Sequence, residues 1–321
     1  MKKQIVVTGG AGFIGANLVK SLNERGIDDI VIVDRLGEEE KWRNLRSLRY
    51  EDFIDIAEFL QMVLKSELWP IEANFHMGAC SATTEKDADY LLHNNYAYTR
   101  ELCIWALENN VRFVYASSAA TYGDGSFGYS DADENTLRLS PLNMYGYSKH
   151  MFDLWALKND LLDSIAGIKF FNVYGPYEDH KGDMRSVVNK AFAQIMEQGK
   201  VQLFKSHIPE YKDGEQVRDF VFVKDAVDVA LYFYDNPEVS GIYNCGTGKA
   251  RTWVDLVTAV FKAMGREPDI EFIDMPVEIR DKYQYHTEAD TAKLRASGYS
   301  AEFTSLEDGV YSYVNDYLTK L

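Results

Sequence analysis

The residue pair with the clearest capacity for proton transfer is Tyr145 and Lys149, within residues 141–149. If this stretch is helical, a spacing of four places both side chains on one face. A phenol with a pKa near 10 is a poor base at neutral pH, but an adjacent ammonium favours the phenolate. Lowering that pKa by two units requires only about 3 kcal/mol. The pair therefore predicts a general acid/base.

The same spacing occurs at Tyr177 and Lys181, but Gly175-Pro176 directly before it indicates a loop rather than a helix. Only Tyr145 and Lys149 are therefore expected to share a helix face. A predicted strand over residues 112–118 ends in Ser117 and Ser118. Hydroxyls at the carboxyl end of a central parallel strand lie where doubly wound sheets bind substrate.

A glycine-rich turn near the N-terminus must position these groups. Residues 5–7 predict a buried parallel strand, and an apolar stripe after the turn predicts a helix. Between them, Gly9 permits a tight bend, Gly12 lets the backbone approach a pyrophosphate, and Gly15 lets helix and strand pack closely. The helix N-terminus then presents free N–H groups to phosphate. We interpret this turn as a dinucleotide site.

The choice of dinucleotide depends on the end of the second predicted strand. Asp34 lies there, about 20 residues past the glycines, where an acid binds a ribose 2′-hydroxyl and selects NAD. Arg35 and Lys41 follow, and basic side chains can instead accommodate the 2′-phosphate of NADP. Glu38–Glu40 lies between them. The sequence favours NADP and leaves NAD open.

Composition excludes several classes of partner. The net charge of −16 over 321 residues argues against nucleic acid and anionic membranes, which require a basic face. No apolar run approaches 18 residues, and the chain enters its first strand directly, which predicts neither a membrane span nor a signal peptide. Cys80, Cys103 and Cys245 are far apart, in no metal-ligand spacing, and indicate a reducing cytoplasm and no metal site.

An anionic substrate would have to meet local cations in so acidic a chain. Lys181, Lys190 and Arg218 are candidates for binding phosphate, whereas we interpret Arg185 as ordinary surface charge. Upstream, small residues at 78–81 follow a predicted strand and would let a cofactor approach closely. In that strand, His76 is interpreted as a core histidine with satisfied hydrogen bonds.

Together these motifs resemble the nucleotide-sugar branch of the extended short-chain dehydrogenase/reductase family over nearly the whole chain. Within that branch, the chain is most similar to epimerases that act at C6 of an ADP-linked heptose. The strings that carry the resemblance are residues 8–15, 77–85, 115–123, 143–149, 171–176 and 180–182.

The resemblance implies roles position by position. The implied catalytic residues are Ser118, which bonds the reacting oxygen, the acid/bases Tyr145 and Lys181, and Lys149, which holds the nicotinamide ribose. The implied cofactor residues are Gly9, Gly12, Phe13, Ile14, Gly15, Asp34, Arg35, Lys41, Gly78, Ala79, Cys80, Ser81, Asn94, Lys149, Val173 and Lys181. The implied substrate residues are Ser118, Asn172, Asp183, Lys190, Phe204, Arg218 and Tyr283. The departures from the family pattern are Met77, Ile56, Asp183 and Lys190.

The implied reaction is inversion of C6 of ADP-glycero-manno-heptose through transient oxidation by tightly bound NADP, for lipopolysaccharide core supply, by a homo-oligomer. One alternative is a UDP-hexose 4-epimerase using NAD, which would not require Lys181. Another is a non-catalytic NADP sensor, which would not need Ser118, Tyr145 and Lys149 together. Ala119-Ala120 disfavours a 4,6-dehydratase, because dehydration needs an acid and a base there.

The expected fold is α/β, a doubly wound parallel Rossmann sheet with a second, smaller α/β domain. Residues 1–170 and 218–248 are predicted to form the NADP-binding domain. Residues 171–217 and 249–321 are predicted to form the nucleotide-sugar-binding domain. A long helix is expected over residues 88–109 and one strand over residues 168–174.

Overall fold

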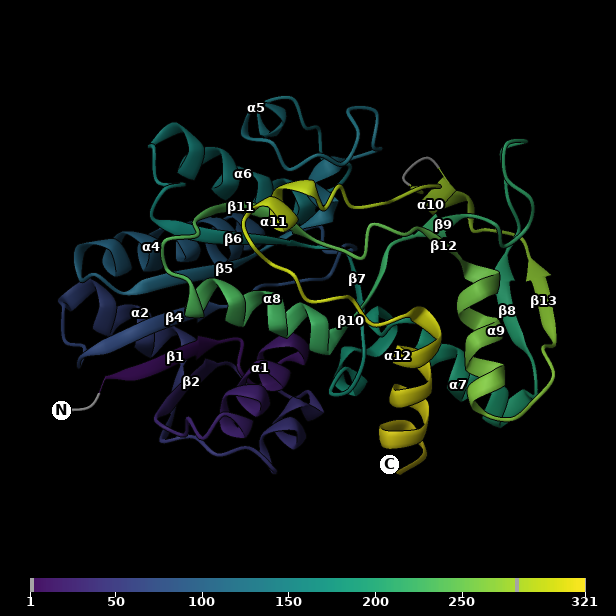
Figure 1. Ribbon diagram of the computed structural model, residues 1–321, viewed down its shortest axis with the longest axis horizontal. Coiled ribbons are helices and arrows are strands. Elements are labelled where there is room, and N and C mark those ends of the chain that lie inside the picture. The colour runs from purple at the N-terminus through teal and green to yellow at the C-terminus, as the bar shows by residue number, and fades with distance from the viewer. Residues whose placement is uncertain (1–2, 281–282, 321) are drawn as a thin grey trace.

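A seven-stranded, all-parallel sheet forms the larger part of the computed structural model, which describes residues 3–280 and 283–320 (Figure 1). In spatial order its strands are β11 (Gly241–Cys245), β6 (Ile165–Phe170), β5 (Arg112–Ser118), β4 (Ile71–His76), β1 (Gln4–Thr8), β2 (Ile30–Asp34) and β3 (Asp52–Asp55). Thr8 at the end of β1 is in register with His76 at the end of β4. The predicted doubly wound α/β sheet is confirmed.

Helices cover both faces because alternate residues of each strand are apolar on opposite sides. On β1, Ile5 and Val7 pack into one cluster with α1 (Phe13–Glu24) and α8 (Val223–Asp235), whereas Val6 packs into another. The second cluster includes the helices α2 (Ile56–Lys65), α4 (Tyr98–Glu108) and α6 (Met144–Lys158). The chain leaves β1 and β4 toward opposite faces, so the crevice between these two strands is the switch point where ligands bind in such sheets.

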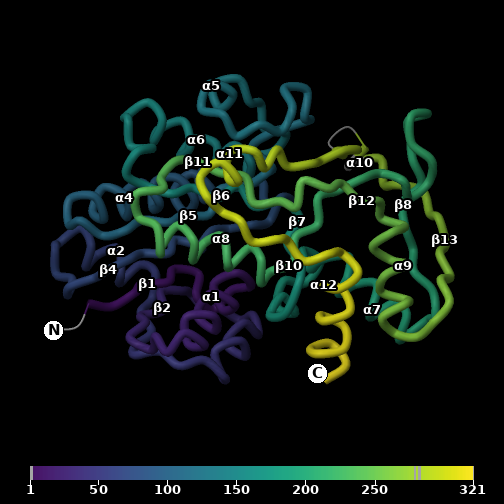
Figure 2. Tube along the Cα trace, in the orientation of Figure 1, coloured from purple at the N-terminus to yellow at the C-terminus, as the bar shows by residue number. Residues whose placement is uncertain are grey.

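A smaller lobe packs beside the sheet and has its own apolar cluster, which includes Val188, Leu203, Leu256 and Val310 (Figures 1 and 2). Its main elements are α7 (Val187–Gln198), β8 (Val201–Phe204), α9 (Trp253–Ala263), β13 (Ile270–Ile273) and α12 (Leu306–Ser312). Two short ladders, β7 (Asn172–Tyr174) with β10 (Phe220–Phe222) and β9 (Val217–Arg218) with β12 (Arg251–Thr252), lie where the chain passes between the lobes.

The remaining elements are short. They are η1 (Glu40–Leu45), α3 (Ala88–Leu91), η2 (Leu92–Ala97), η3 (Ala119–Tyr122), α5 (Asp133–Thr136), η4 (Asp179–Met184), α10 (Val277–Arg280), α11 (Ala292–Ala296), η5 (Tyr313–Tyr317) and η6 (Leu318–Lys320). Within the described chain, no helix combines the length and apolarity that crossing a bilayer requires.

Two predicted elements differ from the structure. The helix expected over residues 88–109 contains a π-helical turn, η2, between α3 and α4. The strand expected over residues 168–174 is divided at Phe171, whose N–H bonds to the carbonyl of Cys245 on β11. The next N–H, of Asn172, bonds to the carbonyl of Asp219 instead. The backbone changes partner within one residue, so β6 and β7 belong to different sheets.

Candidate active site

A cavity of about 800 Å³ opens above the carboxyl ends of β1, β4 and β5, at the switch point. Every residue predicted for the cofactor lines it, and so do the four residues predicted for catalysis, Ser118, Tyr145, Lys149 and Lys181. Of the predicted substrate residues that the structure describes, the lining takes in Ser118. Sequence segments from 8 to 184 thus meet around one space.

The floor of this cavity is a backbone cradle. Gly9 has φ +69°, and a Cβ there would lie 2.5 Å from the Cα of Gly78, in the loop after β4. A Cβ on Gly15 would collide with the carbonyl of Gly9. Gly12 is the N-cap of α1, so the helix N-terminus begins at the cradle. Bare backbone N–H groups at a helix N-terminus suit the pyrophosphate of a dinucleotide, and the residues present fit that group.

Asp34 is fixed at the edge of the cradle. One carboxylate oxygen accepts from the N–H of Ala11 at 3.0 Å, and the other accepts from the N–H of Arg35 at 2.7 Å and from Lys41 Nζ at 2.9 Å. The acid and the two cations expected around the adenosine ribose therefore lie together. The Arg35 side chain is exposed, whereas Lys41 is largely buried against the acid.

Tyr145 and Ser118 form the proton-transfer end of the cavity. Burial raises the pKa of the Tyr145 phenol above its ordinary value, and a hydrogen bond with Ser118 acts in the opposite direction. The ammonium of Lys149 donates to the carbonyl of Ala116 at 2.9 Å. In the chain alone the pKa of the phenol is therefore raised rather than lowered, and the causes of the shift do not include the ammonium of Lys149.

Lys149 itself is 4% exposed, and burial lowers its pKa to about 8, with the charge of Asp153 opposing the shift. At neutral pH this side chain remains mostly cationic. A buried cation beside Tyr145 can hold ribose hydroxyls and stabilise negative charge that develops nearby.

The π-helical turn η2 supports this arrangement. Asn95 accepts from the N–H of Cys80 at 2.9 Å and donates to the carbonyl of the same residue at 3.0 Å. Its amide also donates to Ser148 Oγ at 3.0 Å, and Ser148 in turn donates to the carbonyl of Tyr145. Sequence reasoning did not identify Asn95. Its only signal in the sequence was its place beside Asn94, a predicted cofactor residue. Both lie in a π-helical turn, a feature that is frequent at functional sites.

Lys181 lines the cavity from a segment that comes directly before α7 of the smaller lobe. It lies in η4, and its Nζ is 5.2 Å from the ring centroid of Phe13. Burial lowers its pKa, while the carboxylate of Glu178 raises it. The preceding Tyr177 has φ +71°, which confirms the predicted loop and separates this pair from the helical one. A second group able to exchange a proton therefore lines the same cavity as Tyr145 and comes from a different segment of the chain.

Arg218 forms an aromatic clamp with two rings. Its guanidinium carbon lies 5.5 Å from the Trp253 ring centroid and 5.1 Å from that of Tyr283, and Trp253 Nε1 donates to the Tyr283 hydroxyl at 2.9 Å. The guanidinium is 7% exposed, and its described hydrogen bonds include Nη1 to the carbonyl of Val217. Sequence reasoning missed Trp253, because no spacing relates it to its two partners.

The other predicted substrate residues come from separate elements outside the cavity lining. Asn172 begins β7, Asp183 is exposed in η4, Lys190 lies on α7 and Phe204 ends β8. His76, by contrast, is a core residue as predicted. Its nitrogens bond to Thr8 and Thr99, and burial lowers its pKa to about 3.

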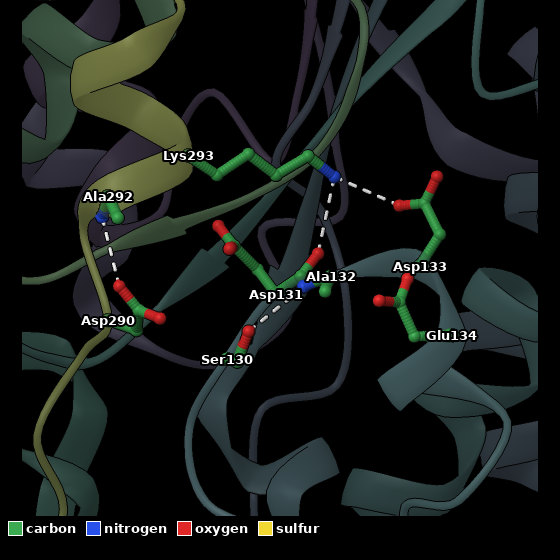
Figure 3. A pocket seen from close by; sticks show the side chains of 8 residues that line it. All are labelled: Ser130, Asp131, Ala132, Asp133, Glu134, Asp290, Ala292 and Lys293. Atoms are coloured by element: carbon green, nitrogen blue, oxygen red, sulfur yellow. Dashed lines mark hydrogen bonds and ion pairs between the residues drawn. The ribbon is translucent and has the colours of Figure 1, made fainter.

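A second hollow, of about 370 Å³, lies between residues 130–134 and the start of α11 (Figure 3). Its lining is rich in carboxylates, and Lys293 bonds there to Asp133 and to the carbonyl of Asp131. The described lining includes no predicted site residue, so the chemistry is concentrated in the first cavity.

Comparison with known proteins agrees with this geometry. A model of the NAD dependent epimerase/dehydratase family matches residues 5–246. The chain is 60% identical to an ADP-L-glycero-D-manno-heptose-6-epimerase of Nitratidesulfovibrio vulgaris (strain DP4), over 98% of this chain and 97% of that one. It is 50% identical to the Fusobacterium nucleatum protein of that name, over 98% of both chains. The crystal structure of the Helicobacter pylori protein of that name superposes with a TM-score of 0.82, at 28% identity, over 98% of this chain and 96% of that one.

Proposed function

The chain belongs to the NAD dependent epimerase/dehydratase family, and on that premise we propose that it is an epimerase that inverts C6 of ADP-glycero-manno-heptose, using tightly bound NADP. One observation carries the proposal beyond the family name. Two side chains able to exchange a proton, Tyr145 and Lys181, come from different segments and line the same cavity. An inversion through a flat ketone needs an acid/base for each orientation of the oxygen.

When bound, a nicotinamide accepts the C6 hydride and later returns it to the other face of the carbon. The protein's own residues manage the proton and the geometry. Tyr145 accepts the hydroxyl proton in one orientation, and Ser118 donates a hydrogen bond to the same oxygen. After the ketone turns, Lys181, whose pKa is lowered by burial, donates the proton that restores the hydroxyl. The hydride taken from C6 is returned to C6, so the reaction has no net redox change. The proton that Tyr145 gains balances the one that Lys181 gives up, and exchange with solvent restores both groups before the next turnover.

We assign NADP rather than NAD from the surroundings of Asp34. Its carboxylate already bonds to backbone N–H groups and to Lys41, so the cation can turn to a 2′-phosphate while the acid stays satisfied. Arg35, exposed at the same edge, adds a second positive charge. Both support a phosphorylated ribose at this position.

We place the nucleotide sugar between the cavity and the smaller lobe. Arg218 brings a buried positive charge whose described neighbours include two aromatic rings, an arrangement suited to a diphosphate beside a sugar. On this proposal residues 1–170 and 218–248 serve the dinucleotide, and residues 171–217 and 249–321 serve the ADP-heptose. Asn172, Asp183, Lys190, Phe204 and Tyr283 are assigned to the latter.

The protein is further proposed to act as a homo-oligomer in the cytoplasm, where it supplies heptose for lipopolysaccharide core, with no nucleic-acid or membrane partner. Light scattering on the purified full-length chain measures the number of subunits. A single-chain mass would contradict the assembly and leave the chemistry untouched.

The decisive experiment identifies the cofactor and the reacting carbon. Denaturing the purified protein should release NADP, read by mass. Incubation with ADP-heptose should then exchange configuration at C6 in the NMR spectrum, while UDP-galactose should remain unchanged at C4. Exchange at C4 of UDP-galactose with released NAD would establish the 4-epimerase instead. Bound dinucleotide with no exchange in either sugar would indicate a sensor.

A further inference from the structure

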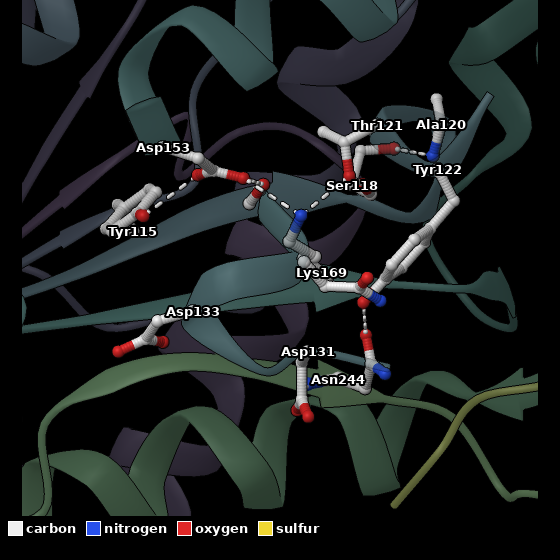
Figure 4. Close-up of polar contacts among 12 residues, drawn as sticks. Tyr115, Ser118, Ala120, Thr121, Tyr122, Asp131, Asp133, Asp153, Lys169 and Asn244 are labelled. Atoms are coloured by element: carbon white, nitrogen blue, oxygen red, sulfur yellow. Dashed lines mark hydrogen bonds and ion pairs between the residues drawn. The ribbon is translucent and has the colours of Figure 1, made fainter. Parts of the chain in front are cut away.

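A buried ion pair lies directly behind the Ser118 end of β5 (Figure 4). Lys169 on β6 and Asp153 on α6 are both fully buried, with Nζ 3.3 Å from Oδ2. Burying two charges is costly, and well-packed apolar side chains of similar volume often give equal or greater stability. Stability alone therefore does not account for charges at this position, and the groups that they contact indicate another role.

The pair holds the strand end from two sides. Asp153 Oδ2 accepts from Ser117 Oγ at 2.7 Å. Lys169 Nζ donates to Thr121 Oγ1 at 2.8 Å, and that hydroxyl donates to the carbonyl of Ser118 at 2.8 Å. Figure 4 shows these bonds converging on the turn that carries Ser118. The backbone that carries Ser118 is therefore held by two charges that are not part of the cavity lining.

Asp153 of this pair also acts electrostatically on Lys149. Asp153 lies four residues after Lys149 on α6, and its carboxylate raises the pKa that burial of Lys149 lowers. Lys169 pairs with the same carboxylate at 3.3 Å, so its positive charge offsets the negative charge that Asp153 presents to Lys149. Other titratable groups surround these three residues. They are His76 on β4, Cys80 in the loop after it, Tyr115 on β5, Tyr122 in η3, Tyr145 and His150 on α6, and Asp131 and Lys293, whose charges act on Lys169. Figure 4 labels Tyr115, Tyr122 and Asp131 among them.

We propose that Asp153 and Lys169 are positioning residues of the active site, which fix the Ser118 end of β5 and set the charge that Lys149 experiences. The inference rests on the proposed function, in which Ser118 bonds the reacting oxygen and Lys149 holds the nicotinamide ribose. Neither residue of the pair touches substrate or cofactor, since both are fully buried.

The electrostatic part predicts opposite effects for the two charges. Asp153→Asn removes a negative charge, which lowers the pKa of Lys149, so its cation is lost at lower pH. Lys169→Met removes a positive charge and has the reverse effect. The alkaline limb of kcat, and of dinucleotide affinity in the full-length chain, should move by about one pH unit, down for Asp153→Asn and up for Lys169→Met. A purely structural role would not give opposite signs.

The anchoring part is tested without changing any charge. Thr121→Val removes the link from Lys169 to the Ser118 carbonyl, so kcat should fall by about tenfold with KM and the pH limb unchanged. Tyr122→Phe is the matched control. This variant removes the buried hydrogen bond of 2.7 Å from the Tyr122 hydroxyl to Asn244, which involves no group on β5. Its kcat and the alkaline limb of its pH profile should therefore equal those of the parent.

Folded Asp153→Asn and Lys169→Met proteins whose profiles coincide with that of the parent would overturn the electrostatic role. A parental kcat in Thr121→Val would overturn the anchor. Where a single variant does not fold, the double variant Asp153→Asn/Lys169→Met replaces it. In the double variant the alkaline limb of kcat should lie at the same pH as in the parent, while kcat itself should be lower. An unchanged kcat would refute the proposal. A parent chain inactive on ADP-heptose would refute the proposed function, while the dinucleotide-affinity profiles would still test the pair.

Discussion

The side-chain amide of Asn95 donates to the hydroxyl of Ser148 at 3.0 Å, and this bond joins the π-helical turn η2 to helix α6 between Tyr145 and Lys149. Because Asn95 also exchanges two hydrogen bonds with the backbone of Cys80, one buried amide links the cofactor loop to the catalytic helix. The proton-transfer residues are therefore held relative to the dinucleotide cradle through a residue that does neither job itself.

Replacing Asn95 should weaken the link between the cofactor loop at Cys80 and helix α6. Asn95→Ala leaves the Cys80 backbone groups without their partner and removes one of the two hydrogen bonds of the Ser148 hydroxyl, so we expect a loss of about 1–3 kcal/mol in the free energy of unfolding. Turnover should fall by about tenfold. Asn109→Ala is the control, because that amide bonds to the carbonyl of Trp105 at the end of α4, away from the cavity. Equal kinetic effects of both variants would contradict the linking role. Chemical denaturation and steady-state kinetics measure the two quantities.

The two acid/bases should be separately essential. Tyr145→Phe and Lys181→Met should each reduce turnover by about 10² or more, which is the usual range for loss of an acid or base. Burial lowers the pKa of Lys181 as it lowers that of Lys149, so both ammonium groups lose their protons at a lower pH than an ordinary lysine and both contribute to the alkaline fall in kcat. Near-normal turnover in either variant would remove that residue from its role.

The glycine cradle should not tolerate a single methyl group. Gly9→Ala places a Cβ 2.5 Å from the Cα of Gly78 at a positive φ, so bound dinucleotide should be absent from the purified variant. Gly26→Ala is a matched control. It also has a positive φ, but nothing lies within 4 Å of its Cβ, so it should cost about 1 kcal/mol and retain the cofactor. Absorbance of the released dinucleotide at 260 nm distinguishes the outcomes; normal loading of Gly9→Ala would contradict the cradle.

The aromatic clamp predicts a binding defect. Arg218→Met should raise KM for the nucleotide sugar by at least about tenfold with a smaller change in kcat, since it removes a buried charge that holds phosphate. Arg251→Met is the control. That arginine faces Arg218 in the β9–β12 ladder but pairs with Asp255 and Glu307, so KM should stay the same. A pure kcat effect in Arg218→Met would place the guanidinium elsewhere in the reaction.

Cofactor choice should depend on Lys41. Lys41→Met removes the ion pair of 2.9 Å with Asp34 and one of the two cations proposed for the 2′-phosphate. The ratio of NADP to NAD affinity should fall by about tenfold or more, measured by fluorescence titration of protein stripped of dinucleotide. An unchanged ratio would indicate that Lys41 does not bind a 2′-phosphate and that Asp34 instead binds the ribose 2′-hydroxyl of NAD.

Local patterns explain what the sequence could predict. The glycine turn, Asp34 after the second strand and the Tyr145–Lys149 spacing are each determined within a few turns of chain, and the structure brings them to one cavity. The division between β6 and β7 could not be predicted in this way, because it depends on where Asp219 and β11 supply carbonyls to Phe171 and Asn172.

Contacts between distant segments of the chain could not be predicted from the sequence for the same reason. Trp253 meets Arg218 and Tyr283 only after three separate segments have come together. The rise in the pKa of Tyr145 was also not predictable, since it requires the burial of the phenol.

The order of segments in the two lobes has a consequence for biosynthesis. The large sheet requires β11, made only after the chain has already built α7 and β8 of the other lobe. The apolar centre of that lobe in turn requires Leu306, Val310 and Tyr313. Neither lobe corresponds to one uninterrupted stretch of chain, so a nascent chain that still lacks α12 on the ribosome leaves the apolar centre of the smaller lobe uncovered.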